Sequence, residues 1–433
     1  MGAAMNSESV GFSTGAPILF NAERLPRWLR APNTLARMLG IESPRLTPES
    51  LTASAARSAG LPARFPPHVE RSLEVLCRSL RDEARLHWFG QMNQWTLLVT
   101  GLSALLRVEQ ALRDDPSLLE TKLLAPVIVT GLPRSGTTFL HRLLSEATEA
   151  AGVPLYGHFM PTPRRPVDYR RLECAALLEP WRIAGRAYEM DAMHLMRSEL
   201  PDECNWGMRI GGQSMIFWNS APAYGYLHWV LGQDLRETYQ LYRRTLLLHQ
   251  RQVPGRRLTL KCPHHLAWLP ALREAIPEAH IVQTHRDPLQ MTPSECKLVL
   301  SMHALATDAL DRRRTVDHVV FKALTFAERA VAFAESAPGE RVQHVDYDAL
   351  VSDPVQTARA IHASLGLPFS ARHEAQLGAF ASRNRQHKHG RNPYSIDQFG
   401  LDAGRLSEAF RPYRERFLAG SGRPQAIDEG AQT

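Results

Sequence analysis

The spacing of apolar residues divides the chain into two parts near residue 120. From Leu35 to about Leu119 apolar residues recur at helical spacing. The clearest run lies after His68 and comprises Val69, Leu73, Leu76 and Leu80. The segment Asp114-Asp115-Pro116 ends this pattern, because proline cannot continue a helix. The sequence therefore predicts an N-terminal helical segment over residues 1–120.

After this break, short apolar runs alternate with helical stretches. The first run, Ala125 to Thr130, leads into a glycine-containing turn and a predicted helix from Thr137 to Leu144. Further predicted strands are Arg257 to Leu260, His280 to Thr284 and Arg341 to Val345. This alternation is typical of an α/β protein. We expect a P-loop-like three-layer fold over residues 121–420, with a mostly parallel central sheet flanked by helices, and a flexible tail over 421–433.

The predicted helical stretch between the first unit and the second strand, about residues 179–250, is rich in aromatic and methionine residues. Its members are Trp181, Tyr188, Met190, Met193, Met196, Trp206, Met208, Met215, Phe217, Trp218, Tyr224, Tyr226 and Trp229. Methionine and aromatic side chains suit a pocket for a ring or a lipid. Such residues are also common in cores, so we assign about two thirds of them to the core. The rest are expected to line an acceptor site that caps the sheet.

Composition narrows the choice of partners only partly. The formal net charge is +7, which suits a polyanionic ligand, nucleic acid or an acidic membrane surface. No nucleic-acid reader motif is found, and neither arginines nor aromatics form a stripe, so we expect no nucleic-acid partner. Most basic residues are arginines; the lysines are Lys122, Lys261, Lys297, Lys322 and Lys388. Because lysines are rare in this chain, a lysine inside a candidate motif is less likely to be there by chance.

Cysteine usage and the N-terminal sequence indicate a cytoplasmic protein. The 5 cysteines are scattered and include no Cys-x-x-Cys pair, which argues against a disulfide framework and a zinc cluster. Residues Met1 to Phe20 lack the order of charged and apolar residues found in a signal peptide. The most apolar stretch, Trp95 to Leu106, is too short to span a bilayer. We therefore expect no transmembrane segment.

The loop after the first predicted strand has the spacing of a phosphate-binding loop. Gly131-Leu-Pro-Arg-Ser-Gly-Thr-Thr138 places two glycines five residues apart, directly before a helix. Backbone N–H groups of such a loop and the positive end of the helix attract an anion. Thr137 stands where nucleotide hydrolases carry an essential lysine, which disfavours ATP or GTP hydrolysis. Arg134 offers a cation in its place.

A second candidate anion site follows another predicted strand. Arg286 lies at the end of the strand, before Asp287-Pro288, and Ser294 follows eight residues after the arginine. A guanidinium presents a planar fork to phosphate oxygens, and a serine hydroxyl adds a donor. Taken alone, Arg286 would be expected to form a surface salt bridge. An arginine and a serine at this spacing resemble the 3′-phosphate site of a known family of nucleotide-dependent transferases. With the first loop, they imply a ligand with two separate anionic ends.

These motifs resemble the PAPS-dependent sulfotransferases, where PAPS is 3′-phosphoadenosine-5′-phosphosulfate, and especially the bacterial branch with arginine in the loop. The resemblance assigns the 5′-phosphosulfate to Arg134, Ser135, Gly136, Thr137 and Thr138. It assigns the 3′-phosphate to Arg286 and Ser294. Further matches are Leu260 to His265, Asp346 to Leu350, Asp353-Pro354, Tyr394-Ser395 and Phe399 to Leu401. The resemblance covers about Leu124 to Phe417 and excludes the residues before Lys122.

The resemblance implies transfer of a sulfuryl group from PAPS to a hydroxyl of a small, apolar acceptor such as a phenol, sterol or lipid alcohol. Such transfer needs in-line geometry, charge stabilisation and a base, without a metal. Lys261 matches the lysine of the family's Lys-x-Pro-x-His pattern and is the candidate for stabilising the leaving phosphate.

Three residues compete for the role of base. His265 matches the histidine of the same pattern. His158 lies where the bacterial family carries Trp-Glu, with the glutamate proposed as base, so this chain departs from that assignment. Glu203 is the third candidate, although acidic residues at helix starts are more often caps. We favour a histidine over Glu203, and the sequence does not separate His265 from His158.

Two other functions compete with sulfuryl transfer. A nucleotide-dependent kinase would share the sheet architecture, but Thr137 in place of lysine counts against it. A non-catalytic nucleotide- or nucleic-acid-binding protein would bind without forming a sulfonated product. The sequence does not identify the acceptor or the oligomeric state.

Overall fold

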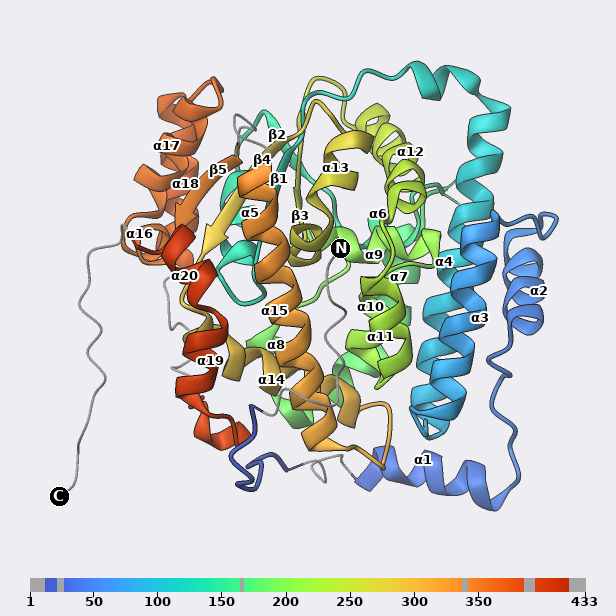
Figure 1. Ribbon diagram of the computed structural model, residues 1–433. Helices are drawn as coiled ribbons and strands as arrows, with labels where there is room; N and C mark the ends of the chain where they lie inside the picture. The colour runs from blue at the N-terminus through green and yellow to red at the C-terminus, as the bar shows by residue number, and fades with distance from the viewer. Residues whose placement is uncertain (1–11, 22–26, 164–166, 337–341, 385–393, 420–433) are drawn as a thin grey trace.

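The computed structural model describes residues 12–21, 27–163, 167–336, 342–384 and 394–419, and its centre is a parallel sheet (Figure 1). The strands are β1 (Val127–Gly131), β2 (Ala150–Gly152), β3 (Arg257–Lys261), β4 (His280–His285) and β5 (Val342–Asp346). They form one 5-stranded sheet in the order β2-β3-β1-β4-β5, and every pairing is parallel. The predicted mostly parallel sheet is confirmed. Arg341, with which the last strand was predicted to begin, lies outside the described residues.

The central position of β1 explains its uninterrupted apolar sequence. All of its residues are buried, because β3 and β4 flank it and helices cover both faces of the sheet. Its register pairs Gly131 with Thr284, so β1 and β4 end side by side. The edge strand β2 was not predicted, since Ala-Ala-Gly lacks the branched and aromatic residues that mark strands.

The N-terminal part is helical, as predicted. Its helices are α1 (Arg27–Met38), α2 (Pro48–Ala59), α3 (Pro67–Asp82) and α4 (Trp88–Asp114), followed by the 3₁₀ helix η2 (Pro116–Glu120). The run predicted for the core face of α3 is buried: Val69, Leu73, Leu76 and Leu80. This run belongs to the same apolar cluster as Ile128 of β1. The N-terminal helices therefore pack onto the α/β part and share its core.

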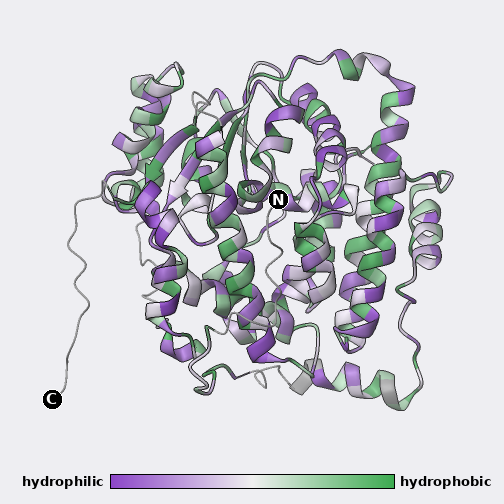
Figure 2. Ribbon diagram, in the orientation of Figure 1, coloured by the Kyte–Doolittle hydropathy of each residue, from purple (hydrophilic) through white to green (hydrophobic). Residues whose placement is uncertain are grey.

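The remaining helices of the α/β part surround the sheet. They are α5 (Thr137–Ser145), α13 (Leu269–Ala275), α14 (Pro288–Ala304), α15 (Arg312–Ser336), α16 (Tyr347–Ser352), α17 (Pro354–Ser364), α18 (Ala371–Arg383), α19 (Ala403–Ala409) and α20 (Arg411–Phe417). Figure 2 shows polar and apolar residues together on the outer helices α17 and α19, as expected of helices with one buried face. The predicted tail, 421–433, lies outside the described residues.

The stretch predicted to cap the sheet is mostly a series of short helices. It contains α7 (Arg170–Gly185), α8 (Met190–Met193), α9 (Cys204–Met208), α10 (Ile216–Ser220), α11 (Tyr224–Leu231) and the longer α12 (Arg236–Gln252), with α6 (Leu155–Phe159) before it. Glycines help to interrupt it; Gly212, for example, has φ +70° directly after a 3₁₀ turn. Short helices can present side chains in several directions around a pocket.

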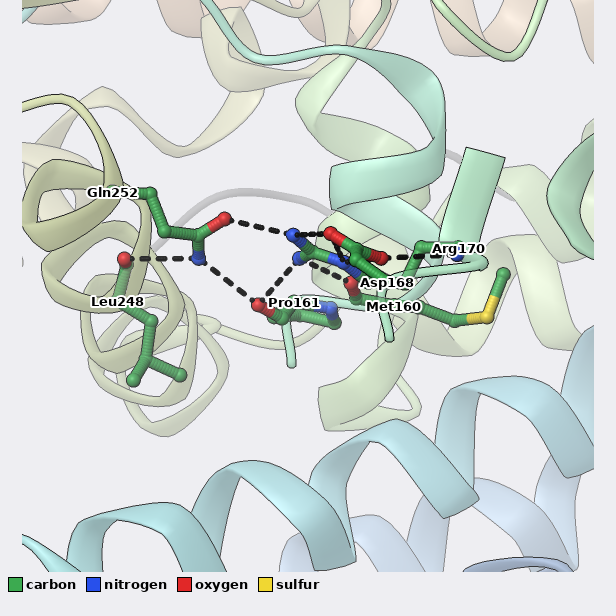
Figure 3. A network of polar contacts seen from close by, with 6 residues as sticks. All are labelled: Met160, Pro161, Asp168, Arg170, Leu248 and Gln252. Atoms are coloured by element: carbon green, nitrogen blue, oxygen red, sulfur yellow. Dashed lines mark hydrogen bonds and ion pairs between the residues drawn. The ribbon is translucent and has the colours of Figure 1, made fainter. Parts of the chain in front are cut away.

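One arginine fixes the start of this cap (Figure 3). The guanidinium of Arg170 pairs with Asp168 at 2.7 Å and donates to the carbonyls of Met160 and Pro161 at 3.1 and 3.0 Å. It also donates to Gln252 of α12 at 3.0 Å. These bonds hold the beginning of α7 against the end of α12. None of the helices within the described ranges combines the length and apolar character needed to cross a membrane.

Candidate active site

A cavity of about 730 Å³ lies at the carboxyl ends of the parallel strands. Its wall includes residues that follow four different strands: Arg134 after β1, Pro263 after β3, Arg286 after β4 and Tyr347 after β5. Open parallel sheets commonly bind ligands at this edge. The cap and α14 close the other side of the cavity. Its size falls within the range of small-molecule sites.

The loop after β1 has a backbone that only glycine fits at two points. Gly131 has φ +149°, and a Cβ there would lie 2.5 Å from Oγ1 of Thr284. Gly136 has φ +90°, and its Cβ would meet the ring of Tyr347 at 2.9 Å. The chain then enters α5 at Thr137, so the first N–H groups of this helix are directed toward the loop. Gly136, Thr137 and Thr138 line the cavity, as the anion-site hypothesis requires.

Arg134 extends from this loop across to α14. It has a positive φ of 70°, which is uncommon for a residue with a side chain. Its Nε donates to Oγ of Ser294 at 3.0 Å, and its Nη1 donates to the carbonyl of Met193 at 2.9 Å. Burial lowers the pKa of Arg134, against the opposing effect of Glu295. An arginine remains charged despite such a shift.

The second predicted anion-binding element faces the same cavity. Arg286 and Ser294 both line it. Nη1 of Arg286 donates to the carbonyl of Arg134 at 3.2 Å, and its guanidinium lies 4.2 Å from the ring centroid of Tyr347. The register of β1 and β4 produces this proximity, because both elements begin where adjacent parallel strands end. Residues 152 positions apart in sequence thus form one basic wall.

Ser135 is placed differently from its neighbours in the loop. Its hydroxyl is fully buried, donates to the carbonyl of Leu132 at 2.6 Å and lies 2.7 Å from Oγ1 of Thr284. The side chain therefore ties the loop to β4 and does not line the cavity.

Lys261 and Glu203 form a buried ion pair at the edge of the cavity. Lys261 ends β3, its side chain is 1% exposed, and its Nζ lies 2.7 Å from Oε1 of Glu203. Glu203 precedes α9 and lines the cavity, whereas Lys261 lies behind it. Burial alone would raise the pKa of Glu203, but the adjacent Lys261 reverses this effect and the pKa lies below its ordinary value. The carboxylate is consequently ionised at neutral pH.

The same carboxylate approaches two other potential metal ligands. Glu203, Cys262 and His264 have ligand atoms within 4.8 Å of one another. The cation that contacts Glu203 in this structure is the ammonium group of Lys261.

The two histidines favoured from the sequence do not line the cavity. Nδ1 of His265 bonds to the hydroxyl of Tyr239 at 2.8 Å, and burial lowers the pKa of His265 to about 3. His158 on α6 is 1% exposed and packs near His249, and burial holds its pKa well below the ordinary value. Neither side chain belongs to the cavity wall, and a base must lie within hydrogen-bond reach of the proton that it removes. Glu203 is the one member of that trio on the cavity wall.

Sequence reasoning missed His264, which lines the cavity beside Glu203. The segment Pro263–Trp268 forms the 3₁₀ helix η5, which directs adjacent histidines to different sides. His264 has its Nδ1 3.4 Å from Sγ of Cys262, and burial lowers its pKa to about 3. The motif identified the segment, but which histidine faces the cavity depends on the turn that follows the strand.

The other side of the cavity is mostly apolar. From the aromatic and methionine set, it is lined by Trp181, Met190, Met193, Met196 and Trp206. Aliphatic and thioether side chains of α10 and α14 complete this part: Ile216, Leu298, Val299 and Met302. The larger part of the set is packed elsewhere, for example Trp218 and Tyr226, both fully buried. The cavity therefore has a basic end and an apolar end.

The fold agrees with the comparisons to known proteins. A profile of the sulfotransferase family matches residues 126–371, more than half of the chain. The chain belongs to the sulfotransferase family.

Its relatives include mycobacterial enzymes. The chain is 27% identical over 297 residues to the omega-hydroxy-beta-dihydromenaquinone-9 sulfotransferase Stf3 of Mycobacterium bovis and of Mycobacterium tuberculosis, a match that covers 64% of this chain and 68% of the relative. The structure resembles sulfotransferase STF9 from Mycobacterium avium with a TM-score of 0.77 at 24% identity, over 86% of this chain and 97% of that one. For STF1 from Mycobacterium tuberculosis the TM-score is 0.69 at 26% identity, over 85% and 99% of the two chains.

Proposed function

We propose that this sulfotransferase uses PAPS as donor and transfers its sulfuryl group to a hydroxyl of a small, apolar acceptor. The observation that carries the proposal is the single cavity onto which both anion-binding elements open. Arg134 and Ser294, from the two elements, are in direct contact at 3.0 Å. A nucleotide with an anionic group at each end matches this arrangement, whereas the loop lacks the lysine on which ATP-hydrolysing enzymes depend.

The residues of the basic end divide between two anionic groups. Arg286 and Ser294 would hold the 3′-phosphate, since a guanidinium and a hydroxyl supply charge-assisted hydrogen bonds. The backbone of Gly136, the start of α5 and the hydroxyls of Thr137 and Thr138 would hold the 5′-phosphosulfate. Arg134 lies between the two groups of residues. The side chain of Ser135 supports the loop through its buried hydrogen bonds and would not contact the nucleotide.

We assign the role of base to Glu203. It is ionised, lines the cavity and adjoins the apolar end through Trp206, so it can accept a proton from a hydroxyl placed there. Lys261 donates to Glu203 and is buried behind it. We therefore place Lys261 as the residue that keeps this carboxylate charged and in position. Arg134 then takes the role of cation near the leaving phosphate, because it lies in the loop and lines the cavity.

The apolar end of the cavity is the proposed binding site for the acceptor. A wall of tryptophan, methionine and aliphatic side chains favours a ring or a lipid chain over a sugar. The name of the Stf3 relatives, a hydroxylated dihydromenaquinone sulfotransferase, is consistent with a hydroxyl on an apolar molecule. The acceptor of this chain is proposed as a member of that broad chemical class, an apolar alcohol or phenol.

The direct test is incubation of the protein with labelled PAPS and a panel of phenols, sterols, lipid alcohols and sugars. Label in a phenol, sterol or lipid product, with adenosine 3′,5′-bisphosphate released in equal amount, is the expected result. The matched control is Arg286→Ala, which should abolish transfer at the same donor concentration. Transfer to sugars alone would contradict the acceptor class. Transfer unaffected by Arg286→Ala would contradict the assigned donor site.

A further inference from the structure

A second buried ion pair lies beside the cavity. Lys322 of α15 pairs with Oε1 of Glu295 on α14, and the side chains are 1% and 4% exposed. The ammonium also lies 4.7 Å from the ring centroid of Trp218. Glu295 lines the cavity, whereas Lys322 lies behind it, an arrangement that parallels Glu203 and Lys261. Two of the few lysines in this chain are thus buried behind cavity carboxylates.

Stability alone does not account for such a pair. Removing two charges from water costs several kcal/mol per ion, and apolar replacements of a buried pair are often neutral or stabilising. A lysine behind a carboxylate does, however, supply a buried countercharge and leaves part of the carboxylate facing the cavity. A carboxylate has two oxygens and about four acceptor positions, so one ammonium does not use its full capacity. The pair therefore presents a strong hydrogen-bond acceptor to whatever occupies this part of the cavity.

Glu295 on α14 lies between the basic and the apolar end, since its charge also acts on Arg134. Val299 and Met302 follow it by four and seven residues, so the three share one helix face and all line the cavity. Ser294, one residue earlier, turns instead to Arg134. Glu295 is consequently the polar residue at the beginning of the acceptor-facing stripe of α14.

Asn219 of α10 adds a second polar group to this side of the cavity. It lines the cavity, and its Oδ1 is buried without a hydrogen-bond partner among the described residues. Asn219 follows Trp218, whose ring contacts Lys322 and whose carbonyl bonds to His303 of α14 at 2.7 Å. A buried amide oxygen that lacks a partner is costly unless a ligand or water supplies one.

We infer that Glu295 and Asn219 form a polar subsite for a second hydroxyl of the acceptor, separate from the hydroxyl that receives the sulfuryl group. This inference rests on the proposed function. A hydroxyl donates one hydrogen bond and accepts others. It can donate to the Glu295 carboxylate or to Oδ1 of Asn219, both of which are acceptors on the cavity wall. The acceptor is then an apolar molecule with two hydroxyls, and the subsite selects it over an otherwise identical mono-ol.

The test compares 2-naphthol with 2,7-dihydroxynaphthalene, which differ only by the second hydroxyl. Binding is measured by tryptophan fluorescence in the presence of adenosine 3′,5′-bisphosphate, and turnover is measured with PAPS. The diol has two equivalent hydroxyls, which alone would give a statistical factor of about two. Beyond this factor, the wild-type protein should favour the diol by at least about tenfold in both Kd and kcat/KM. The binding measurement does not depend on catalysis. Binding selectivity without sulfuryl transfer would therefore support the subsite while contradicting the proposed function.

The informative variant is Glu295→Leu/Lys322→Leu, which removes both charges and leaves neither one buried alone. It should lose the diol preference while keeping its kcat/KM for 2-naphthol. Asn219→Leu should lose a smaller part of the preference. The control Glu109→Leu/Arg244→Leu, which removes a pair between α4 and α12, should retain it in full.

Three results would overturn the inference. One is equal binding of the two naphthols, or binding of neither, by the wild-type protein. Another is an unchanged preference in the folded double variant. The last is a double variant that binds adenosine 3′,5′-bisphosphate normally but loses turnover of 2-naphthol as well, since Glu295 would then serve the reacting hydroxyl.

Discussion

The basic and apolar ends of the cavity are built in different ways. The basic end consists of short segments that directly follow β1 and β4, and its glycines, arginines and hydroxyls occur in compact motifs. The apolar end takes side chains from α7, from the stretch 190–196, and from α9, α10 and α14, which are spread over residues 181–302. Adjacent parallel strands fix the first set, whereas packing of short helices fixes the second.

This difference explains why one end can be identified from a motif and the other cannot. An anion needs N–H groups and cations at defined positions, which restricts residue types over a few consecutive positions. An apolar ligand needs surface of suitable shape, which many residue types provide. Mutations should therefore separate the two ends: changes at the basic end should affect the nucleotide, and those at the apolar end the acceptor.

The largest expected effect is at the junction of the two ends. Glu203→Gln removes the proposed base and should lower kcat by on the order of 10³, within the usual contribution of acid–base catalysis. Binding of adenosine 3′,5′-bisphosphate should change little. Single-turnover kinetics and calorimetry measure the two quantities. Glu199→Gln, an exposed acidic residue nearby, is the matched control and should retain activity.

A kcat within tenfold of wild type in Glu203→Gln would contradict the assignment of the base. Thermal unfolding of the variant checks that a lower kcat does not result from loss of the fold, since Lys261 loses its charged partner.

Lys261→Met should change the pH dependence of the reaction. The pKa of Glu203 is lowered in the folded protein, so the acid limb of kcat/KM should lie below the ordinary glutamate pKa. Without Lys261, burial dominates and raises this pKa, so the limb should move upward. The pH profile of kcat/KM measures the shift. Lys261→Arg keeps the charge and should keep the limb near its original position; a limb unmoved in Lys261→Met would refute the coupling.

The same coupling affects stability. A carboxyl with a lowered folded pKa stabilises the folded state above its unfolded pKa. This contribution is lost as the pH falls through the folded pKa, and Lys261→Met should abolish it.

Ser294→Ala should affect the basic end alone. The variant loses a hydroxyl assigned to the 3′-phosphate, and the Kd of adenosine 3′,5′-bisphosphate should rise about tenfold, as for one hydrogen bond to a charged group. The KM of the acceptor at saturating PAPS should remain the same. Calorimetry and initial rates provide these values. An equal rise in both constants would show that the ends are not separable at this residue.

The smallest effects are expected at the histidines outside the cavity. His265→Asn and His158→Asn should change kcat by less than about threefold, because neither side chain reaches the proposed hydroxyl. Both should lower the melting temperature, since the replaced rings are buried. A loss of kcat by more than a hundredfold in either folded variant would restore that histidine as the base.

Much of the fold could be predicted from the sequence because local patterns specify it. The buried face of α3 and the apolar run of β1 follow directly from residue spacing. The strand β2 could not be predicted, since its three small residues gain their strand conformation from pairing with β3. The break-up of the cap into short helices likewise depends on tertiary packing.

For the site, too, some features could be predicted from the sequence and others could not. The sequence identified the segments that meet at the cavity, including Arg134, Arg286 and Ser294. It did not predict which side chains within them face inward, as Ser135 and His265 show. Nor could it pair Glu203 with Lys261, 58 residues away, or Glu295 with Lys322 on another helix. These pairings depend on how the helices pack.

The central claim is that one cavity binds a nucleotide through two separate anionic groups. Calorimetry with adenosine 3′,5′-bisphosphate and with 5′-AMP, which lacks the 3′-phosphate, tests it on the wild-type protein and Arg286→Ala. We predict that the bisphosphate binds the wild-type protein at least about a hundredfold more tightly, and that Arg286→Ala removes most of this advantage. Equal affinity for the two nucleotides, or an advantage that survives in Arg286→Ala, would contradict the account.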